Sequence, residues 1–119
     1  MKTNELSGAA LDWAVAQAEG LLAFGHRKIS DDCVITLSTG EFEIFAPSIN
    51  WEQGGKLIER ECIDLEWTGI PNADFFCTIQ GKYEAHGTAP LIAAMRCYVA
   101  SKLGEDVEIP TEFLIARGA

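Results

Sequence analysis

The segment Gly54-Gly55-Lys56 is the part of the sequence whose residue types come closest to phosphate-binding chemistry. A P-loop needs the pattern GxxxxGK followed by serine or threonine. Here Asn50 stands at the first glycine position and Leu57 follows the lysine, so the pattern is incomplete. Glycines near a helix N-terminus nevertheless leave N–H donors that suit an anion. Two interpretations stay open: the glycines allow another backbone to approach closely, or they and Lys56 bind an anionic group.

Arg96 lies within the segment TAPLIAAMRCYVASKLG, which is apolar on nearly every side of a helical projection. A buried guanidinium does not lose its proton at physiological pH, so it needs a carboxylate partner or a bound anion. A structural ion pair with a glutamate such as Glu59 or Glu61 is one interpretation. The other is a negatively charged ligand, which would place Arg96 beside a cavity.

The three tryptophans provide aromatic surface for packing or for recognition. Trp67 ends a predicted strand next to a Gly-Ile-Pro turn, where side chains often line the mouth of a pocket. Trp13 lies opposite the main apolar face of its helix, which predicts an interface or a ligand wall. Trp51 shares a predicted helix face with three residues that indicate core packing: Gly55, Ile58 and Cys62.

No arrangement of residues in the sequence predicts catalysis or metal binding. His26 and His86 are far apart, and neither an HxH nor an HxxxH spacing is present. There is no GxSxG turn, and no cysteine has a base next to it in the sequence. The four cysteines form no CxxC pair, which indicates buried, reduced thiols rather than zinc ligands or disulfides. We therefore expect a protein that is not an enzyme and has no cofactor, although the many carboxylates leave a hydrolase hypothesis open.

The length and charge of the chain restrict its organisation and its partners. A chain of 119 residues that is 48% hydrophobic predicts a single domain over residues 1–119. Its 9 basic and 18 acidic residues give a net charge of −9, which disfavours nucleic acids and anionic membranes and favours basic partners. We expect no signal peptide, and the apolar run at Ala89–Met95 is much shorter than the roughly 20 residues of a membrane span. We expect a cytoplasmic protein.

Capping residues and apolar periodicity predict three helices: Ala9–Glu19, Trp51–Glu61 and Ala89–Leu103. Ser7, Asn50 and Thr88 are their predicted N-caps, since each offers a side-chain oxygen to the first free N–H groups. Gly20 and Gly104 are predicted to end the first and third helices.

Alternating apolar residues and turn residues predict two hairpins and a strand between them: Cys33–Leu37 with Glu41–Phe45, Phe75–Gln80 with Lys82–His86, and Cys62–Trp67. Tight turns imply antiparallel pairing. Together with the helices, this order predicts an α+β fold. We expect a small α/β/α sandwich, with a mainly antiparallel sheet of four to five strands and three helices that cover both faces.

Three segments resemble the NinX-type family of small proteins from lambdoid phages and their prophages: ELSGAALDWAVAQAEG, APSINWEQGGKLIERECI and GTAPLIAAMRCYVASKLGEDVEIP. They cover about half of the 119 residues, from one end of the chain to the other. Asn50 departs from the aspartate that is common in relatives, which keeps a helix cap but removes a charge. The residues that match the family's motifs are Trp13, Ser48, Trp51, Gly54, Gly55, Ile58, Glu59, Trp67, Thr88, Pro90, Arg96 and Lys102.

The resemblance implies an α/β/α-sandwich domain and an accessory phage gene expressed in the bacterial cytosol. It implies no enzyme activity, because the family's function is unknown. Small phage accessory proteins usually act by binding, and two hypotheses stay open: capture of a small anionic host molecule, such as a nucleotide-derived immune signal, or inhibition of a host protein. The second hypothesis uses Trp13 as an interface residue, and the second apolar face of its helix predicts a homodimer or higher oligomer. The ligand site of the first hypothesis consists of Trp51, Gly54, Gly55, Lys56, Trp67, Thr88 and Arg96.

Overall fold

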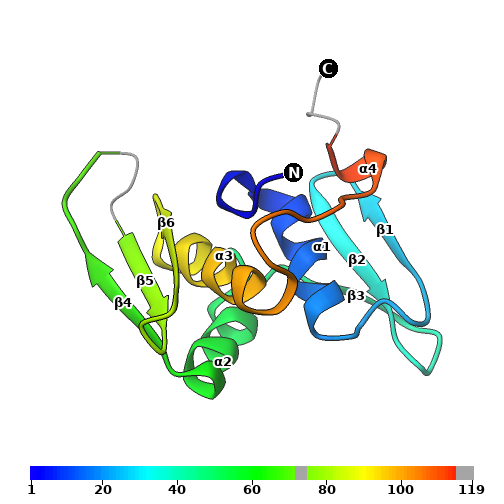
Figure 1. Ribbon diagram of the computed structural model, residues 1–119. Helices are drawn as coiled ribbons and strands as arrows, with labels where there is room; N and C mark the ends of the chain where they lie inside the picture. The colour runs from blue at the N-terminus through cyan, green and yellow to red at the C-terminus, as the bar shows by residue number, and fades with distance from the viewer. Residues whose placement is uncertain (72–74, 115–119) are drawn as a thin grey trace.

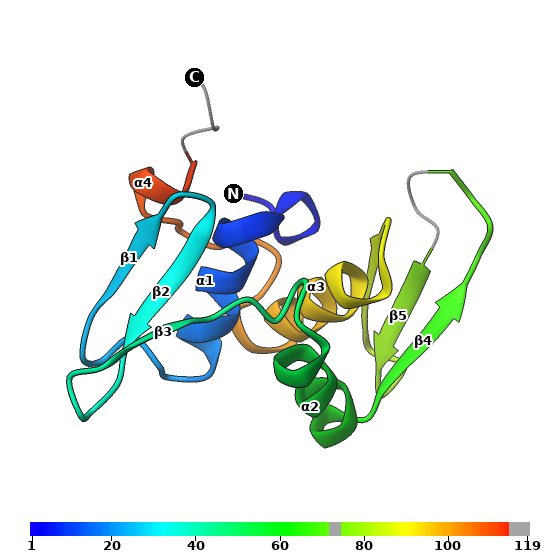
Figure 2. The same cartoon turned by 180° about the vertical axis from the view of Figure 1, so that it is seen from behind.

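Helices occupy the middle of the molecule and a small sheet lies at either end, as a computed structural model that describes residues 1–71 and 75–114 shows (Figure 1). These residues contain three main helices: α1 (Gly8–Ala18), α2 (Trp51–Glu61) and α3 (Pro90–Leu103). We call α1 and the sheet beside it the first lobe, and α2, α3 and the other sheet the second lobe (Figure 2). Because α1 packs against α3, the two lobes share one hydrophobic core.

The sheet of the first lobe has three antiparallel strands, in the order β1 (His26–Ile29), β2 (Asp32–Thr36) and β3 (Phe42–Ile44). Its inner face packs on α1, where Cys33 and Ile35 of β2 are buried. Its outer face carries Phe42 and Ile44, which are exposed. The guanidinium of Arg27 lies 4.8 Å from the centre of the Phe42 ring, and this contact shields part of that aromatic surface.

The sheet of the second lobe also has three antiparallel strands, in the order β4 (Ile63–Trp67), β5 (Phe75–Ile79) and β6 (Tyr83–Gly87). α3 packs across β5 and β6, where Cys77 and Ala85 are buried. Close packing at this contact depends on Gly87, because a Cβ atom at that position would lie 2.6 Å from the backbone nitrogen of Ala93. β4 is an edge strand of this sheet.

The α+β class and the three predicted helices are confirmed, but the expected single sheet is wrong. Within the described residues the strands form two separate sheets, and the helices lie between them rather than on both faces of one. The physical reason is that α1 and α3 are apolar on nearly all sides, and such helices belong in the interior. The β2–β3 and β5–β6 hairpins are confirmed. β1 was not predicted, because its sequence His-Arg-Lys-Ile has no apolar alternation.

Trp13, which was predicted to form an interface or a ligand wall, is buried within the chain. Only 6% of its surface is exposed. Its Nε1–H donates a hydrogen bond to Nδ1 of His26 at 3.1 Å, and its ring packs against Phe113 of the short helix α4 (Thr111–Leu114). α1 lies between β2 and α3 and packs against both. The second apolar face, from which we predicted a homo-oligomer, is therefore covered within the chain.

α2 turns a different face to the core from the one that the sequence predicted. Gly54 and Leu57 are buried, whereas Trp51 is 56% exposed and Cys62 at the end of the helix is exposed. Gly54 explains this orientation, because a Cβ atom there would lie 2.3 Å from the carbonyl oxygen of Pro47. α2 contacts the backbone at Pro47 through Gly54, which has no side chain, and Trp51 consequently points away from the core.

α3 begins at Pro90, and its N-cap is Ala89 rather than Thr88. Thr88 is exposed, and the start of α3 has no side-chain cap bond, so that predicted cap is wrong. Ser7 does stand at the N-cap of α1, but its side chain makes no cap bond either. Gly104 ends α3 with a φ of 89°, as predicted. None of the helices described in residues 1–71 and 75–114 is both long and apolar enough to cross a membrane.

Asp12 is a buried carboxylate on α1. It is 4% exposed, and its Oδ1 accepts a hydrogen bond from the backbone N–H of Ser48 at 2.8 Å. Burial raises the pKa of Asp12 from 3.8 to about 7, although the Ser48 N–H opposes this rise and nearby Asp32 adds to it. The folded protein therefore holds this proton more tightly than the unfolded chain does. As a result, Asp12 lowers stability progressively as the pH rises from 3.8 to about 7, and no further above that range.

We expect the substitution Asp12→Asn to remove this pH dependence. Asparagine keeps an acceptor for the Ser48 N–H but cannot ionise. Between pH 4 and pH 7, the free energy of unfolding of the wild type should fall relative to that of the variant, by at most roughly 1.4 kcal/mol per pH unit. Urea denaturation of both proteins at several pH values measures this difference. A difference that stays constant across the range would show that Asp12 does not titrate there.

Candidate functional site

Arg96 binds two backbone carbonyls rather than a carboxylate. Its Nε donates to the oxygen of Leu6 at 2.8 Å, and its Nη1 donates to the oxygen of His86 at 2.9 Å. Among the described residues, neither Glu59 nor Glu61 forms an ion pair with it, so the predicted glutamate partner is wrong. The side chain is half-buried, and this burial lowers its pKa. Arg96 therefore ties the N-terminal segment to β6 across α3.

The donors at the start of α2 are already engaged. Oδ1 of Asn50 accepts hydrogen bonds from the N–H groups of Glu52 at 2.8 Å and Gln53 at 3.3 Å. The N–H of Gly54 donates to the carbonyl of Asn50 at 2.8 Å. The Asn50 cap is thus confirmed, and it occupies N–H groups that an anion would need. Of the two interpretations of the glycine pair, the structure supports close backbone approach, at Gly54.

A cavity of about 280 Å³ lies between the two lobes, and we call it the interlobe cleft. Residues of α2 form one wall, and residues of β2, β3 and the segments next to them form the other. Its apolar lining consists of Leu21, Ile35, Leu37, Phe45 and Leu57. Its polar lining consists of Glu19, Glu43, Gln53, Lys56 and Arg60. Lys56 is thus a predicted site residue that the structure does place in a cavity.

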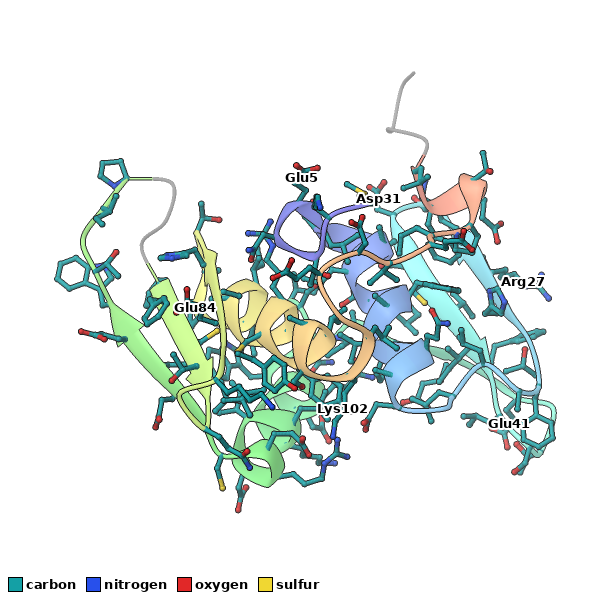
Figure 3. All side chains as sticks on the ribbon, viewed as in Figure 1. Glu5, Arg27, Asp31, Glu41, Glu84 and Lys102 are labelled. Carbon is teal, nitrogen blue, oxygen red and sulfur yellow. The ribbon has the colours of Figure 1, made fainter. Side chains whose placement is uncertain are left out.

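Arg60, on the α2 wall of the cleft, is held by carboxylates from two helices. Nη1 and Nη2 donate to the two oxygens of Glu19 at 2.9 and 2.7 Å, and Nε donates to Glu61 at 2.9 Å. The hydroxyl of Tyr98 also donates to Glu19, and Lys102 near the end of α3 lies 3.4 Å from Glu61 (Figure 3). Arg60 keeps the pKa of Glu19 below its usual value. Two cations and two anions balance in this network, so it leaves no excess positive charge for a ligand.

A larger cavity of about 720 Å³ is a groove on the surface near the N-terminus, between the β5–β6 turn and the end of α3. Its charged lining is mixed in sign: Lys2, Glu5, Lys82, Glu84 and Glu105. None of the predicted site residues lines it. In the part of the chain that the structure describes, no three His, Cys, Asp or Glu side chains are grouped so that they could hold a metal ion.

The structure does not bring the predicted ligand site together. Arg96 and the tryptophans line neither of the two cavities. Trp51 stands exposed at the start of α2, Trp67 is 71% exposed at the end of β4, and Thr88 is exposed before α3. The core does not require the two exposed indole rings, so both are available to a partner.

A comparison of the sequence with known protein families shows to which family the chain belongs. The family model described as Bacteriophage P22, NinX matches residues 2–102. The chain belongs to this NinX family. The resemblance inferred from the three segments is thereby confirmed, and every predicted site residue of this NinX protein lies inside the matched range. No curated protein matches the chain.

Two polar clusters of this NinX protein were not predicted from its sequence. One is the Arg60 network, whose members come from three helices or their ends. The other is Gln53, whose Oε1 accepts from the N–H of Ala46 at 2.7 Å while its Nε2 donates to the oxygen of Ile44 at 3.1 Å. This side-chain amide pairs with the edge of β3 as a neighbouring strand would. Neither cluster has a spacing signal, because its members meet only after the chain has folded.

Proposed function

We propose that this NinX protein acts by binding a protein of the bacterial host, as an inhibitor or adaptor, and not by catalysis. The exposure of two tryptophans, Trp67 at 71% and Trp51 at 56%, carries the proposal. Tryptophan is enriched among the residues that contribute most to protein–protein affinity, because its large ring can be desolvated at little entropic cost. The net charge of −9 supports a basic partner, through faster encounter and complementary contacts.

Capture of a small anionic host molecule, such as a nucleotide-derived immune signal, has less support. Arg96 is engaged by two carbonyls, the first turn of α2 by Asn50, and Arg60 by two carboxylates. This function remains a second candidate, because the positively charged Lys56 lines the interlobe cleft. However, Glu43 lines the same cleft, and its volume of about 280 Å³ is small for a ligand site.

Affinity capture from a lysate of the bacterial host tests the first candidate with three tagged proteins. These are the wild type, the double variant Trp51→Ser/Trp67→Ser, and Phe42→Ser, which changes an exposed aromatic residue of the first lobe. We expect the wild type and Phe42→Ser to retain one host protein in a stoichiometric complex. The double variant should bind the purified partner at least about thirtyfold more weakly in calorimetry, since an interface anchor contributes 2 kcal/mol or more.

Equal retention by all three proteins, or no stoichiometric complex with the wild type, would contradict the proposal. The second candidate is tested by thermal denaturation of the wild type against nucleotides and cyclic dinucleotides. A ligand present at a hundred times its dissociation constant adds about 2.7 kcal/mol to the free energy of unfolding. Stabilisation that Lys56→Glu abolishes and Lys82→Glu retains would favour capture of a small molecule in the cleft.

A further inference from the structure

β4 is an edge strand, and among the described residues no strand pairs with its outer edge. It forms the outermost part of the second lobe in both views of the molecule (Figure 1, Figure 2). Its residues from Asp64 to Trp67 are exposed. An edge strand of this kind presents a row of backbone N–H and C=O groups to which another chain can pair.

The two faces of β4 differ in chemistry. Asp64 and Glu66 lie on the face that points away from the helices, because successive side chains of a strand point to opposite faces. The other face is apolar, and its register partners Ile79 and Cys77 on β5 are buried. The residues of this apolar face are Ile63, Leu65 and Trp67. β4 therefore offers acidic contacts on one side and apolar contacts on the other.

Side chains of the protein hydrogen-bond to two other sheet edges, those of β6 and β3. On β6, the opposite edge of the same sheet, Arg96 donates to the carbonyl of His86 and the N-terminal segment packs beside the strand. On β3, Gln53 pairs with the N–H of Ala46 and the C=O of Ile44. β4 differs from both, because its exposed side chains are acidic and aromatic and, among the described residues, no side chain hydrogen-bonds to its outer backbone edge.

We propose that β4 binds an extended segment of a partner protein, in which lysine or arginine alternates with apolar residues, as a fourth strand of this sheet. The basic residues of that segment lie opposite Asp64 and Glu66, and the apolar residues lie beside Leu65 and Trp67. Pairing of β4 with β4 of a second copy would place acidic residues together, which disfavours self-association at this edge. This inference rests on the proposed function and specifies the segment of the partner.

The test uses the intact protein, labelled with ¹⁵N, and a synthetic eight-residue peptide in which lysine alternates with valine. One control peptide has glutamate in place of lysine, and the other has the same composition with all lysines at one end. We expect the alternating peptide to shift the β4 amide resonances and to protect alternate β4 amides from hydrogen exchange. The glutamate peptide should not bind, and the grouped peptide should bind about tenfold more weakly.

Variants of two glutamates on the same face of the sheet provide a matched comparison. Glu66→Lys should weaken binding of the alternating peptide roughly tenfold, since it turns a favourable cross-strand charge pair into a repulsive one. Glu84→Lys makes the same charge change on β6 and should retain binding. Asp64, Thr78 and Glu84 lie in one row across the sheet, so Glu84 shares the acidic face but stands at the far edge (Figure 3).

Equal binding of the alternating and grouped peptides would overturn the proposal, because it would reveal charge attraction without strand pairing. Loss of binding in Glu84→Lys alone would also overturn it, since Glu84 lines the surface groove. The proposal would also be overturned if the peptide shifted only the amide resonances of residues that line the interlobe cleft. If host-protein capture depends on Trp51 and Trp67 but not on Glu66, the inference about β4 fails and the proposed function stands. If no host protein is captured at all, the proposed function itself fails.

Discussion

Replacing Gly54 with alanine is expected to destabilise the protein by about 3 kcal/mol. A Cβ atom at this position would lie 2.3 Å from the carbonyl oxygen of Pro47 and 2.7 Å from Cδ2 of Leu91. The leucine can rotate, but the carbonyl belongs to the segment that joins β3 to α2 and cannot move without displacing the helix. The new methyl group therefore forces α2 away from α3, and core contacts between these helices are lost.

The neighbouring glycine is a matched control for this prediction. A Cβ atom at Gly55 would meet only the Trp51 ring, at 3.9 Å, which is an ordinary contact distance. Because glycine inside a helix is less favourable than alanine, Gly55→Ala should stabilise the protein by about 0.5–1 kcal/mol. Urea denaturation of the two variants and the wild type measures both effects. Changes of the same sign in the two variants would contradict the close approach of α2 at Gly54.

Replacing Arg96 with leucine is expected to lower the free energy of unfolding by about 2–4 kcal/mol. The substitution removes two hydrogen bonds from a charged donor, each of which contributes about 1.5–3 kcal/mol when buried and less when it is partly exposed. It also leaves the carbonyl oxygens of Leu6 and His86 without this donor. The N-terminal segment should then be held less firmly against β6, because Arg96 hydrogen-bonds to both.

Two further variants separate the geometry of Arg96 from its charge. Arg96→Lys keeps the charge but can reach one carbonyl at a time, so it should recover about half of the lost stability. Lys102→Leu removes an exposed cation from the same helix and should change stability by less than about 1 kcal/mol, as is usual for surface ion pairs. Thermal and urea denaturation provide the measurement. Equal melting temperatures for wild type and Arg96→Leu would mean that the two hydrogen bonds contribute nothing to the fold.

This role of Arg96 also bears on function. The sequence identified the residue correctly as a charge among apolar neighbours, and that observation was the main support for a bound anion. In the structure, backbone carbonyl oxygens accept the hydrogen bonds of the Arg96 guanidinium that an anion was expected to accept. Such carbonyls have no sequence signature, because every residue carries one. The Leu6 oxygen lies 90 positions away along the chain, so no local pattern could have indicated it.

The environments of the tryptophans, two of which carry the proposed function, were predictable only in part. Trp67 was predicted at the mouth of a pocket; it is exposed, but it lines neither of the two cavities. Trp13 and Trp51 were assigned to the wrong environments: the first is in the core and the second at the surface. Helical periodicity shows which residues share a face, but not which face meets the rest of the protein. That choice depends on neighbours that are distant in the sequence.

The sequence by itself determined the α+β class, the family, the net charge, the extent of the three main helices and two of the hairpins. These features depend on interactions within a few residues, such as the Asn50 cap and the alternation along β5 and β6. Only the tertiary structure decided that the strands form two sheets with α1 and α3 between them. It also decided that α2 turns Gly54 inward. The physical reason is that contacts between segments distant in the sequence decide which side chains are buried. Close packing at Gly54 and around the apolar helices α1 and α3 therefore has a larger effect on burial than the local sequence pattern.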